Sequence, residues 1–335
     1  MKNLLIAAYK PPFISSNAFL NILKKRIGEQ KAGFSGILDP FASGLLIVAF
    51  GAYTKLLSFL PKSPKTYRAT LWLGADSQTL DIEGVKSVTS IAPFENVQIT
   101  RALDSLKGEI IYTPPSFSAK RINGVRAYKL AREGKEVALK KQSMQVYALK
   151  LLHYNHPFVS FEVSLSEGGY VRSLGALVCE NLGVKGALSA LQRVGEGRLR
   201  LEQNENGETL FFQDSKESKN AKSADNACVN SVCKEVDYLT SRPTDLSPSN
   251  DKNTAHNNNA IYPLFNLNPL SLLPYPTMSA PCAQEDAYNG KKMLVANTES
   301  GIYKWLFKNF FSLVQVHEGG KISYLYNRIP YADTF

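Results

Sequence analysis

The chain has 335 residues, of which 44% are apolar and 10% aromatic, enough for one large domain with a core and a second, smaller domain. Lys and Arg number 39 against 29 Asp and Glu, and the resulting net charge of +10 favours an anionic partner, first of all a nucleic acid. The N-terminal apolar run breaks at Pro11 and Pro12, and no stretch approaches the roughly 18 apolar residues of a membrane helix. We therefore expect a soluble, cytoplasmic protein that does not contact a membrane.

The number and spacing of the cysteines and histidines argue against a disulfide-stabilised protein and against a zinc protein. Four cysteines are too few and too scattered for a disulfide scaffold. Cys228 and Cys233 form one close pair, and His153 and His156 form another, but neither has a second pair at a zinc-like spacing. We expect free thiols and no metal site.

The hydrophobic pattern predicts helices mixed with strands. Ser15 and Ser16 offer a cap for a helix over residues 17–27, which Gly28 ends. A second helix is predicted over 174–182, with Ser173 as its cap. Alternating or continuous apolar runs predict strands at the N-terminus and over 45–49, 67–74, 144–152 and 158–165. The fold class is therefore α+β with a mixed, largely antiparallel sheet.

Composition divides the chain into three parts. Residues 1–212 alternate apolar segments with turns and form the large domain, which we predict to be the catalytic one. Residues 213–260 are rich in Ser, Asn, Lys and Asp and read as a polar, flexible linker. Residues 261–335 contain short β-like runs, KMLVAN, FFSLVQVH and KISYLYNRI, which predict a small β-rich C-terminal domain.

The segment from 31 to 55 is the most informative. Gly33, Gly36, Pro40 and Gly44 predict a tight loop that enters a buried strand and holds Asp39 in its middle. A carboxylate on a rigid loop suits a side chain that projects into a cleft. An Asp that only caps a turn fits the same spacing, so both interpretations stay open on the local pattern alone.

The order of residues in this segment carries a resemblance. The string contains Gly33, Gly36, Leu38-Asp39-Pro40, Ala42-Ser43-Gly44, Leu45-Leu46, Val48, Gly51 and Thr54-Lys55. It resembles the signature of the TruB family of tRNA pseudouridine synthases. Further segments match in the family's order: KPPFISSN at 10–17, KTYRATLWLG at 65–74, PPSFSAKRINGVRAYKLAREG at 114–134 and EGGYVRSL at 167–174. The resemblance covers about residues 3 to 200.

This resemblance implies the α+β catalytic core of the pseudouridine synthases, together with a reaction and a site. The implied reaction is the cofactor-free isomerisation of uridine to pseudouridine at position 55, in the T-loop of tRNA, on a base flipped out of its stack. Asp39 matches the nucleophilic aspartate, Tyr67 the tyrosine beside the target base, and Arg172 the arginine that pairs with the aspartate. The C-terminal part resembles the family's PUA domain only in its β pattern. Nothing implies a protein partner, and we expect a monomer.

The expected RNA contacts lie around the same motifs. The stretch from Lys120 to Lys141 is strongly basic and offers a phosphate-binding surface, although a solvated helical face has the same composition. Unstacked bases are commonly held by aromatic and basic side chains. The residues predicted to contact RNA are Lys10, Phe34, Lys55, Lys120, Arg121, Arg126 and Tyr170.

Two departures from the family pattern keep an alternative open. Phe34 stands where the family usually has His, and Ser77-Gln78-Thr79, followed by Asp81, stands where it usually has Thr-Asp-Thr. These departures motivate a second hypothesis, a non-catalytic tRNA-binding or tRNA-folding protein on the same scaffold. A third keeps the reaction but changes the RNA target.

Overall fold

The computed structural model describes residues 2–118, 120–122, 124–135, 139–203, 209–213 and 264–331, with the backbone alone for 121–122, 202–203 and 209–213. The predicted linker at 213–260 lies almost entirely outside these residues, as do Cys228 and Cys233. The division into three parts at these boundaries therefore stays a prediction.

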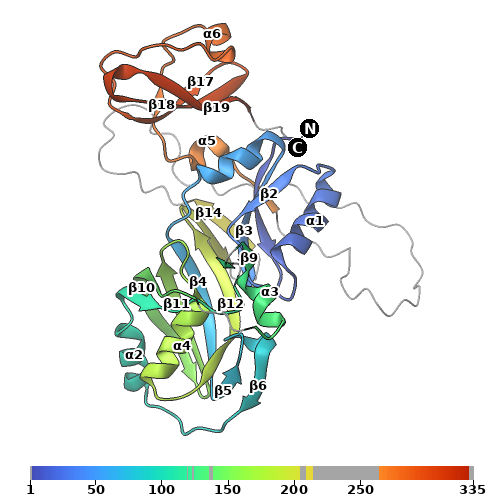
Figure 1. Cartoon of the computed structure of the whole chain (residues 1–335), viewed down its shortest axis with the longest axis vertical. Coiled ribbons are helices and arrows are strands. Elements are labelled where there is room, and N and C mark those ends of the chain that lie inside the picture. The colour runs from blue at the N-terminus through green and yellow to red at the C-terminus, as the bar shows by residue number, and fades with distance from the viewer. Residues whose placement is uncertain are drawn as a thin grey trace, which may run out of the picture.

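One large sheet forms the body of the molecule (Figure 1). In spatial order its strands are β15 (Leu264–Asn266), β1 (Leu5–Lys10), β3 (Ser43–Phe50), β12 (Gly186–Glu196), β4 (Lys65–Leu73), β11 (Phe158–Leu165), β10 (Gln142–Asn155) and β7 (Gly108–Tyr112). Also in the sheet, β2 (Ala32–Ser35) pairs with β3, β13 (Leu199–Gln203) with β12, and β14 (Thr209–Gln213) with β13. Among these pairs only β3 and β12 run parallel, which confirms the prediction of a mixed, largely antiparallel sheet in an α+β fold.

Two helices cover one face of this sheet. Figure 1 shows α2 (Asn96–Asp104) and α4 (Val171–Asn181) on the same side, where they pack against β10, β4 and β12. The predicted alternation in β11 is confirmed, because Val159, Phe161, Val163 and Leu165 are all buried in this core. The opposite face of β4 and β11 is largely polar apart from the paired Trp72 and Phe158 rings, as expected of an antiparallel sheet with one solvated side.

The helix predicted from Ser15 and Gly28 forms as expected. It is α1 (Ser16–Ile27), the Ser15 side chain accepts a hydrogen bond from the Ala18 amide at 3.1 Å, and Gly28 ends the helix at φ 73°. Its buried face, which includes Phe19 and Leu23, packs against β1 and β3.

Short elements connect these parts. They are η1 (Gly51–Ser58), β5 (Ala75–Ser77), η2 (Ile82–Gly84), β6 (Val85–Val88), β8 (Arg121–Ile122), β9 (Val125–Arg126) and α3 (Ala127–Arg132).

The C-terminal region forms a second sheet at one end of the molecule (Figure 1). Its strands are β16 (Thr277–Met278), β17 (Gly301–Leu306), β18 (Phe310–Val316) and β19 (Ile322–Pro330), accompanied by α5 (Pro269–Leu272), α6 (Gln284–Tyr288) and η3 (Glu318–Gly320). Two of the three predicted runs become β18 and β19, which confirms a small β-rich domain. The third run, at 292–297, was wrong as a strand: it contributes one isolated bridge, from Leu294 to Lys321.

The small sheet rests on η1 of the large domain. Tyr53 Oη donates to the Pro330 carbonyl at 2.9 Å, and Tyr326 Oη donates to the Ala52 carbonyl at 2.6 Å. Phe311, Leu313 and Ile329 share one buried cluster with side chains of β1, β3 and η1. The C-terminal sheet is thus joined to the large domain through a common core.

Candidate active site

The loop between β2 and β3 holds Asp39. Its start is crowded, because a Cβ on Gly36 would lie 3.2 Å from both Arg193 Nη1 and Lys65 Nζ. The Ser16 hydroxyl donates to the Leu38 carbonyl and accepts from the Leu38 amide, both at 3.0 Å. These contacts fix the backbone next to Asp39 before any substrate binds.

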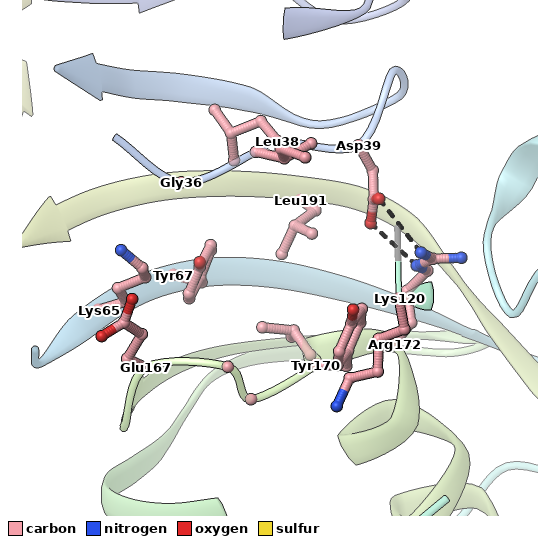
Figure 2. A pocket seen from close by; sticks show the side chains of 14 residues that line it. Gly36, Leu38, Asp39, Lys65, Tyr67, Lys120, Glu167, Tyr170, Arg172 and Leu191 are labelled. Carbon is pink, nitrogen blue, oxygen red and sulfur yellow. Dashed lines mark hydrogen bonds and ion pairs between the residues drawn. The ribbon is translucent and has the colours of Figure 1, made fainter. Parts of the chain in front are cut away.

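Asp39 and Arg172 form a two-point ion pair. Arg172 Nη2 donates to Asp39 Oδ1 at 3.1 Å, and Arg172 Nε lies 2.9 Å from Asp39 Oδ2 (Figure 2). The Arg172 side chain is 3% exposed, whereas that of Asp39 is 31% exposed. A planar fork that holds both carboxylate oxygens sets the direction of the carboxylate and offsets the cost of its negative charge.

Arg172 lies at the start of α4, which corrects two predictions. The helix begins at Val171 rather than at 174, so Arg172 lies in its first turn. Ser173 is inside the helix and does not cap it; its hydroxyl donates to the Thr113 carbonyl at 2.9 Å. The apolar positions 174–178 fit a helix, but the pattern contains no cap that marks its first turn.

The remaining donors of Arg172 are also occupied. Nη1 donates to the Thr79 carbonyl at 2.8 Å and lies 3.3 Å from Asp81 Oδ2, while Nη2 also donates to the Phe117 carbonyl at 3.0 Å. One guanidinium therefore joins two carboxylates, Asp39 and Asp81.

Asp81 is the residue that the sequence analysis missed as a member of the site. It is 3% exposed, and burial raises the pKa of its carboxyl, against the hydrogen bond from Thr79 and the charge of Arg172. The sequence showed this Asp only as part of a departure from the family pattern. Its distance of 42 positions from Asp39 gave no sign that both reach one arginine.

A pocket of about 400 Å³ opens at this ion pair, a size typical of small-ligand sites. Figure 2 shows Asp39 and Arg172 toward one end, Lys65 and Glu167 toward the other, and Tyr67 with Leu191 between them. The pocket is lined by Gly36, Ile37, Leu38, Asp39, Lys65, Tyr67, Lys120, Glu167, Gly168, Gly169, Tyr170, Val171, Arg172 and Leu191. All three predicted catalytic residues, Asp39, Tyr67 and Arg172, thus meet in one cavity.

Tyr67 comes from β4 and forms part of the pocket wall. It is 8% exposed, and burial raises the pKa of its hydroxyl, so the hydroxyl stays protonated at neutral pH. Its ring contributes a flat apolar surface to the same cavity as Asp39, which suits a planar base.

A buried charge cluster lies behind the pocket. Lys65 Nζ bonds Glu196 Oε1 at 2.8 Å, Ser35 Oγ donates to the same carboxylate, and Arg193 Nη2 lies 3.4 Å from Glu196 Oε2. Arg193 Nη2 also donates to the Gly36 carbonyl at 3.3 Å. This cluster connects β2, β4 and β12 to the start of the Asp39 loop.

Lys120 and Tyr170, both predicted to contact RNA, lie together at the pocket. The Lys120 ammonium is 5.9 Å from the centre of the Tyr170 ring and bonds the Gln142 side chain. Burial raises the pKa of the Tyr170 hydroxyl. The structure therefore places an aromatic ring and a cation at the same wall of the cavity.

Lys10 is placed differently from its prediction. Its side chain is fully buried, and its ammonium donates to the carbonyls of Pro11 at 2.8 Å, Ile14 at 2.6 Å and Pro40 at 3.3 Å. An ammonium enclosed by three carbonyls does not reach an RNA phosphate, which corrects the prediction of direct RNA contact. Lys10 instead ties its own loop to the Asp39 loop.

Among the other predicted RNA contacts, Phe34, Lys55 and Arg126 are not part of the pocket lining. Phe34 is half-buried against the α1 cluster, and Lys55 is exposed with its ammonium 5.0 Å from the centre of the Tyr326 ring. Arg126 is half-buried at the start of α3, and the side chain of Arg121 lies outside the described part of the chain. Gln78 is exposed, and its backbone N–H donates to the Gly84 carbonyl at 3.2 Å.

Known proteins are similar to this chain in sequence. The model for the TruB family pseudouridylate synthase N-terminal domain matches residues 24–171. The tRNA pseudouridine synthase B of Helicobacter hepaticus is 43% identical over 333 residues, covering 99% of this chain and 97% of the relative. The protein of that name from Nitratiruptor sp. is 39% identical over 331 residues, covering 98% of each chain.

A solved chain from a Cbf5-Nop10-Gar1 complex is 26% identical with a TM-score of 0.46, covering 59% of this chain and 50% of that one. On the family model and the full-length relatives, this chain belongs to the TruB family of pseudouridylate synthases, an isomerase class that acts on uridine in RNA. Within the described residues, no helix is long and apolar enough to span a membrane.

Proposed function

We propose that this protein isomerises uridine to pseudouridine at position 55, in the T-loop of tRNA, with Asp39 as the nucleophile. One observation carries the proposal: a partly exposed carboxylate is held at two points by a buried arginine, at the end of a cavity that Tyr67 lines. Relatives that match nearly the whole chain and are named tRNA pseudouridine synthase B support tRNA as the substrate.

The reaction suits this geometry. The bond between N1 of the base and C1′ of the ribose breaks, the base turns, and C5 bonds to C1′. The product is an isomer, because the proton lost at C5 is balanced by one gained at N1. Asp39 forms and releases a bond to a substrate carbon, so its oxygen must be aimed at that carbon, and the Arg172 fork fixes its direction.

The apolar middle of the pocket, between the ion pair and the end at Lys65, holds the base. The target uridine must leave its stack to enter, and Tyr67 and Leu191 offer apolar surface to the extruded ring. The net charge of +10 favours approach of a polyanion. This chain by itself brings Asp39, Tyr67 and Arg172 to the pocket, and we propose that it acts as a monomer.

The decisive experiment is incubation of the purified protein with an unmodified tRNA transcript, followed by carbodiimide mapping of pseudouridine. We expect product at the T-loop uridine with the wild type and none with Asp39→Asn, which keeps the shape of the side chain. Tight binding by both proteins without product would replace this proposal with a non-catalytic tRNA-binding function. Product at another uridine would keep the reaction and change the target.

A further inference from the structure

Phe13 combines two unusual properties. Its side chain is 61% exposed, and its backbone has φ 62°, in the left-handed region that disfavours residues other than Gly, Asn and Asp. An exposed ring gains little from burial, so packing within this chain does not explain why an aromatic residue stands here. A strained backbone of this kind is held only by its surroundings.

Those surroundings are contacts with the Asp39 loop. The Lys10 ammonium bonds the Ile14 carbonyl, next to Phe13, and reaches the Pro40 carbonyl, next to Asp39. Lys10 precedes Phe13 in the chain, and Ser16 follows it. The Ser16 hydroxyl bonds both backbone groups of Leu38, which lines the pocket. Both ends of the Phe13 loop are therefore fixed to the loop that carries the nucleophile.

The other aromatic residues of this region are turned inward. Phe41 is 3% exposed in the main core, and Phe34 packs against the α1 cluster. The pocket residue Ile37, two positions before Asp39, is also strongly exposed, at 53%. Phe13 is thus the strongly exposed aromatic ring on the two joined loops at Asp39, outside the pocket lining.

We propose that Phe13 stacks on a nucleobase of the tRNA that flanks the target uridine, outside the catalytic pocket. Extrusion of the target exposes the faces of its neighbours, and an aromatic side chain held at a fixed position covers such a face. This inference rests on the proposed function, because it needs the uridine in the pocket.

The test exploits the backbone strain. Phe13→Gly removes the ring and relieves the positive φ, so we expect a melting temperature no lower than that of the wild type. Phe13→Leu keeps an apolar side chain without an aromatic face, and Phe13→Tyr keeps the face. Ile111→Ala, at an equally exposed apolar site on β7, is the control for loss of surface area.

Steady-state kinetics with unmodified tRNA give the first measurement. We expect KM to rise roughly tenfold for the Gly and Leu variants, as for the loss of one stacked base, with kcat within about threefold. The Tyr variant and the Ile111→Ala control stay at wild-type values. Unchanged KM in both the Gly and the Leu variants would overturn the inference.

A spectroscopic measurement separates this inference from the proposed function. In an Asp39→Asn background, 2-aminopurine replaces either nucleotide that flanks the target uridine. Stacking on Phe13 quenches its fluorescence on binding at one of the two positions, and Phe13→Gly or Phe13→Leu loses that quenching. If wild-type protein binds tRNA without making pseudouridine, the proposed function fails while the quenching still tests Phe13. If it does not bind tRNA, both fail.

Discussion

Arg172 is the residue on which the geometry of the site depends. Its guanidinium lies in ion-pair contact with Asp39 and Asp81 and donates hydrogen bonds to two backbone carbonyls, so one side chain joins four groups. A lysine at this position keeps the charge but makes only point contacts. The orientation of the Asp39 carboxylate is therefore a property of the arginine fork rather than of positive charge alone.

We expect Arg172→Lys to lower the single-turnover rate by roughly 100-fold, because a small misplacement of a reacting group has effects of that order. Binding of tRNA should change by less than about threefold, since Arg172 is buried behind Asp39. Rates under saturating enzyme and filter binding measure the two quantities. A Lys variant with a rate within threefold of the wild type would contradict the role of the fork.

The contribution of Lys10 to the free energy of unfolding increases as the pH rises above 8. Burial lowers the pKa of its ammonium from 10.5 to about 8, against the attraction of Asp39. Below pH 8 both the folded and the unfolded chains carry this proton. Between pH 8 and 10.5 the unfolded chain keeps the proton that the folded protein releases, so the contribution of Lys10 to stability rises with pH in this window.

Urea unfolding of the wild type and of Lys10→Met at pH 7.5 and 9.5 measures this effect. We expect the wild type to gain about 1–2 kcal/mol over the variant between the two pH values. Equal changes in both proteins would show that the Lys10 ammonium is not held in a buried, desolvated state.

At the scale of elements, the strand after the catalytic loop needs a glycine. Gly44 has φ 107°, and a Cβ there would lie 2.3 Å from the Arg193 carbonyl oxygen, where β3 begins to pair with β12. We expect Gly44→Ala to destabilise the protein by about 2–4 kcal/mol, through backbone strain and overlap together.

Gly108→Ala is the matched comparison. Its φ is 99°, but no atom lies within 4 Å of the added Cβ, so the strain acts alone at about 1–2 kcal/mol. Chemical denaturation of both variants separates the two contributions. Equal losses of stability would mean that the backbones of β3 and β12 shift to accommodate the added methyl group at little cost.

The cluster around Glu196 joins three strands behind the pocket. Glu196→Gln keeps the shape but removes the charge that balances Lys65 and Arg193, so we expect a loss of about 2–4 kcal/mol in stability. Glu162→Gln, which breaks an exposed pair with Arg68 at 2.9 Å, should stay within about 0.5 kcal/mol. Urea unfolding compares them, and similar losses in both would show that burial does not strengthen the Glu196 contacts.

The charged residues of this cluster explain why the sequence did not predict the central strand β12. The strands β4, β10 and β11 were predicted, because their apolar alternation follows from local pattern. The central strand β12 was not: it contains Gly186, Gly195, Arg193 and Glu196, which favour a loop unless distant partners neutralise the charges. Asp39, Tyr67 and Arg172 were found through motifs, whereas Asp81 joins them only because the fold brings η2 to α4.

At the scale of the whole molecule, the small sheet is coupled to the large domain. The shared core and the hydrogen bonds of Tyr53 and Tyr326 make separate unfolding of the small sheet costly. Trp305 is fully buried in the small sheet, and Trp72 is the only other tryptophan. Trp72→Phe therefore leaves a fluorescent reporter of the small sheet alone.

We expect the Trp305 fluorescence transition of Trp72→Phe to coincide with the far-ultraviolet circular dichroism transition in urea. Coincident transitions are the mark of a single cooperative unit. Loss of the fluorescence signal at a clearly lower urea concentration would show instead that the small sheet unfolds by itself.

The pairing of β15 with β1 has a consequence for folding during synthesis. One edge of β1 pairs with β3 early in the chain, but its other edge pairs with Leu264–Asn266. While the ribosome makes the intervening residues, that edge has unpaired backbone N–H and C=O groups, with which strands of other chains can pair. The first strand of the enzyme is thus among the last to be completed, and nascent chains stalled before residue 264 should be the ones that most need a chaperone.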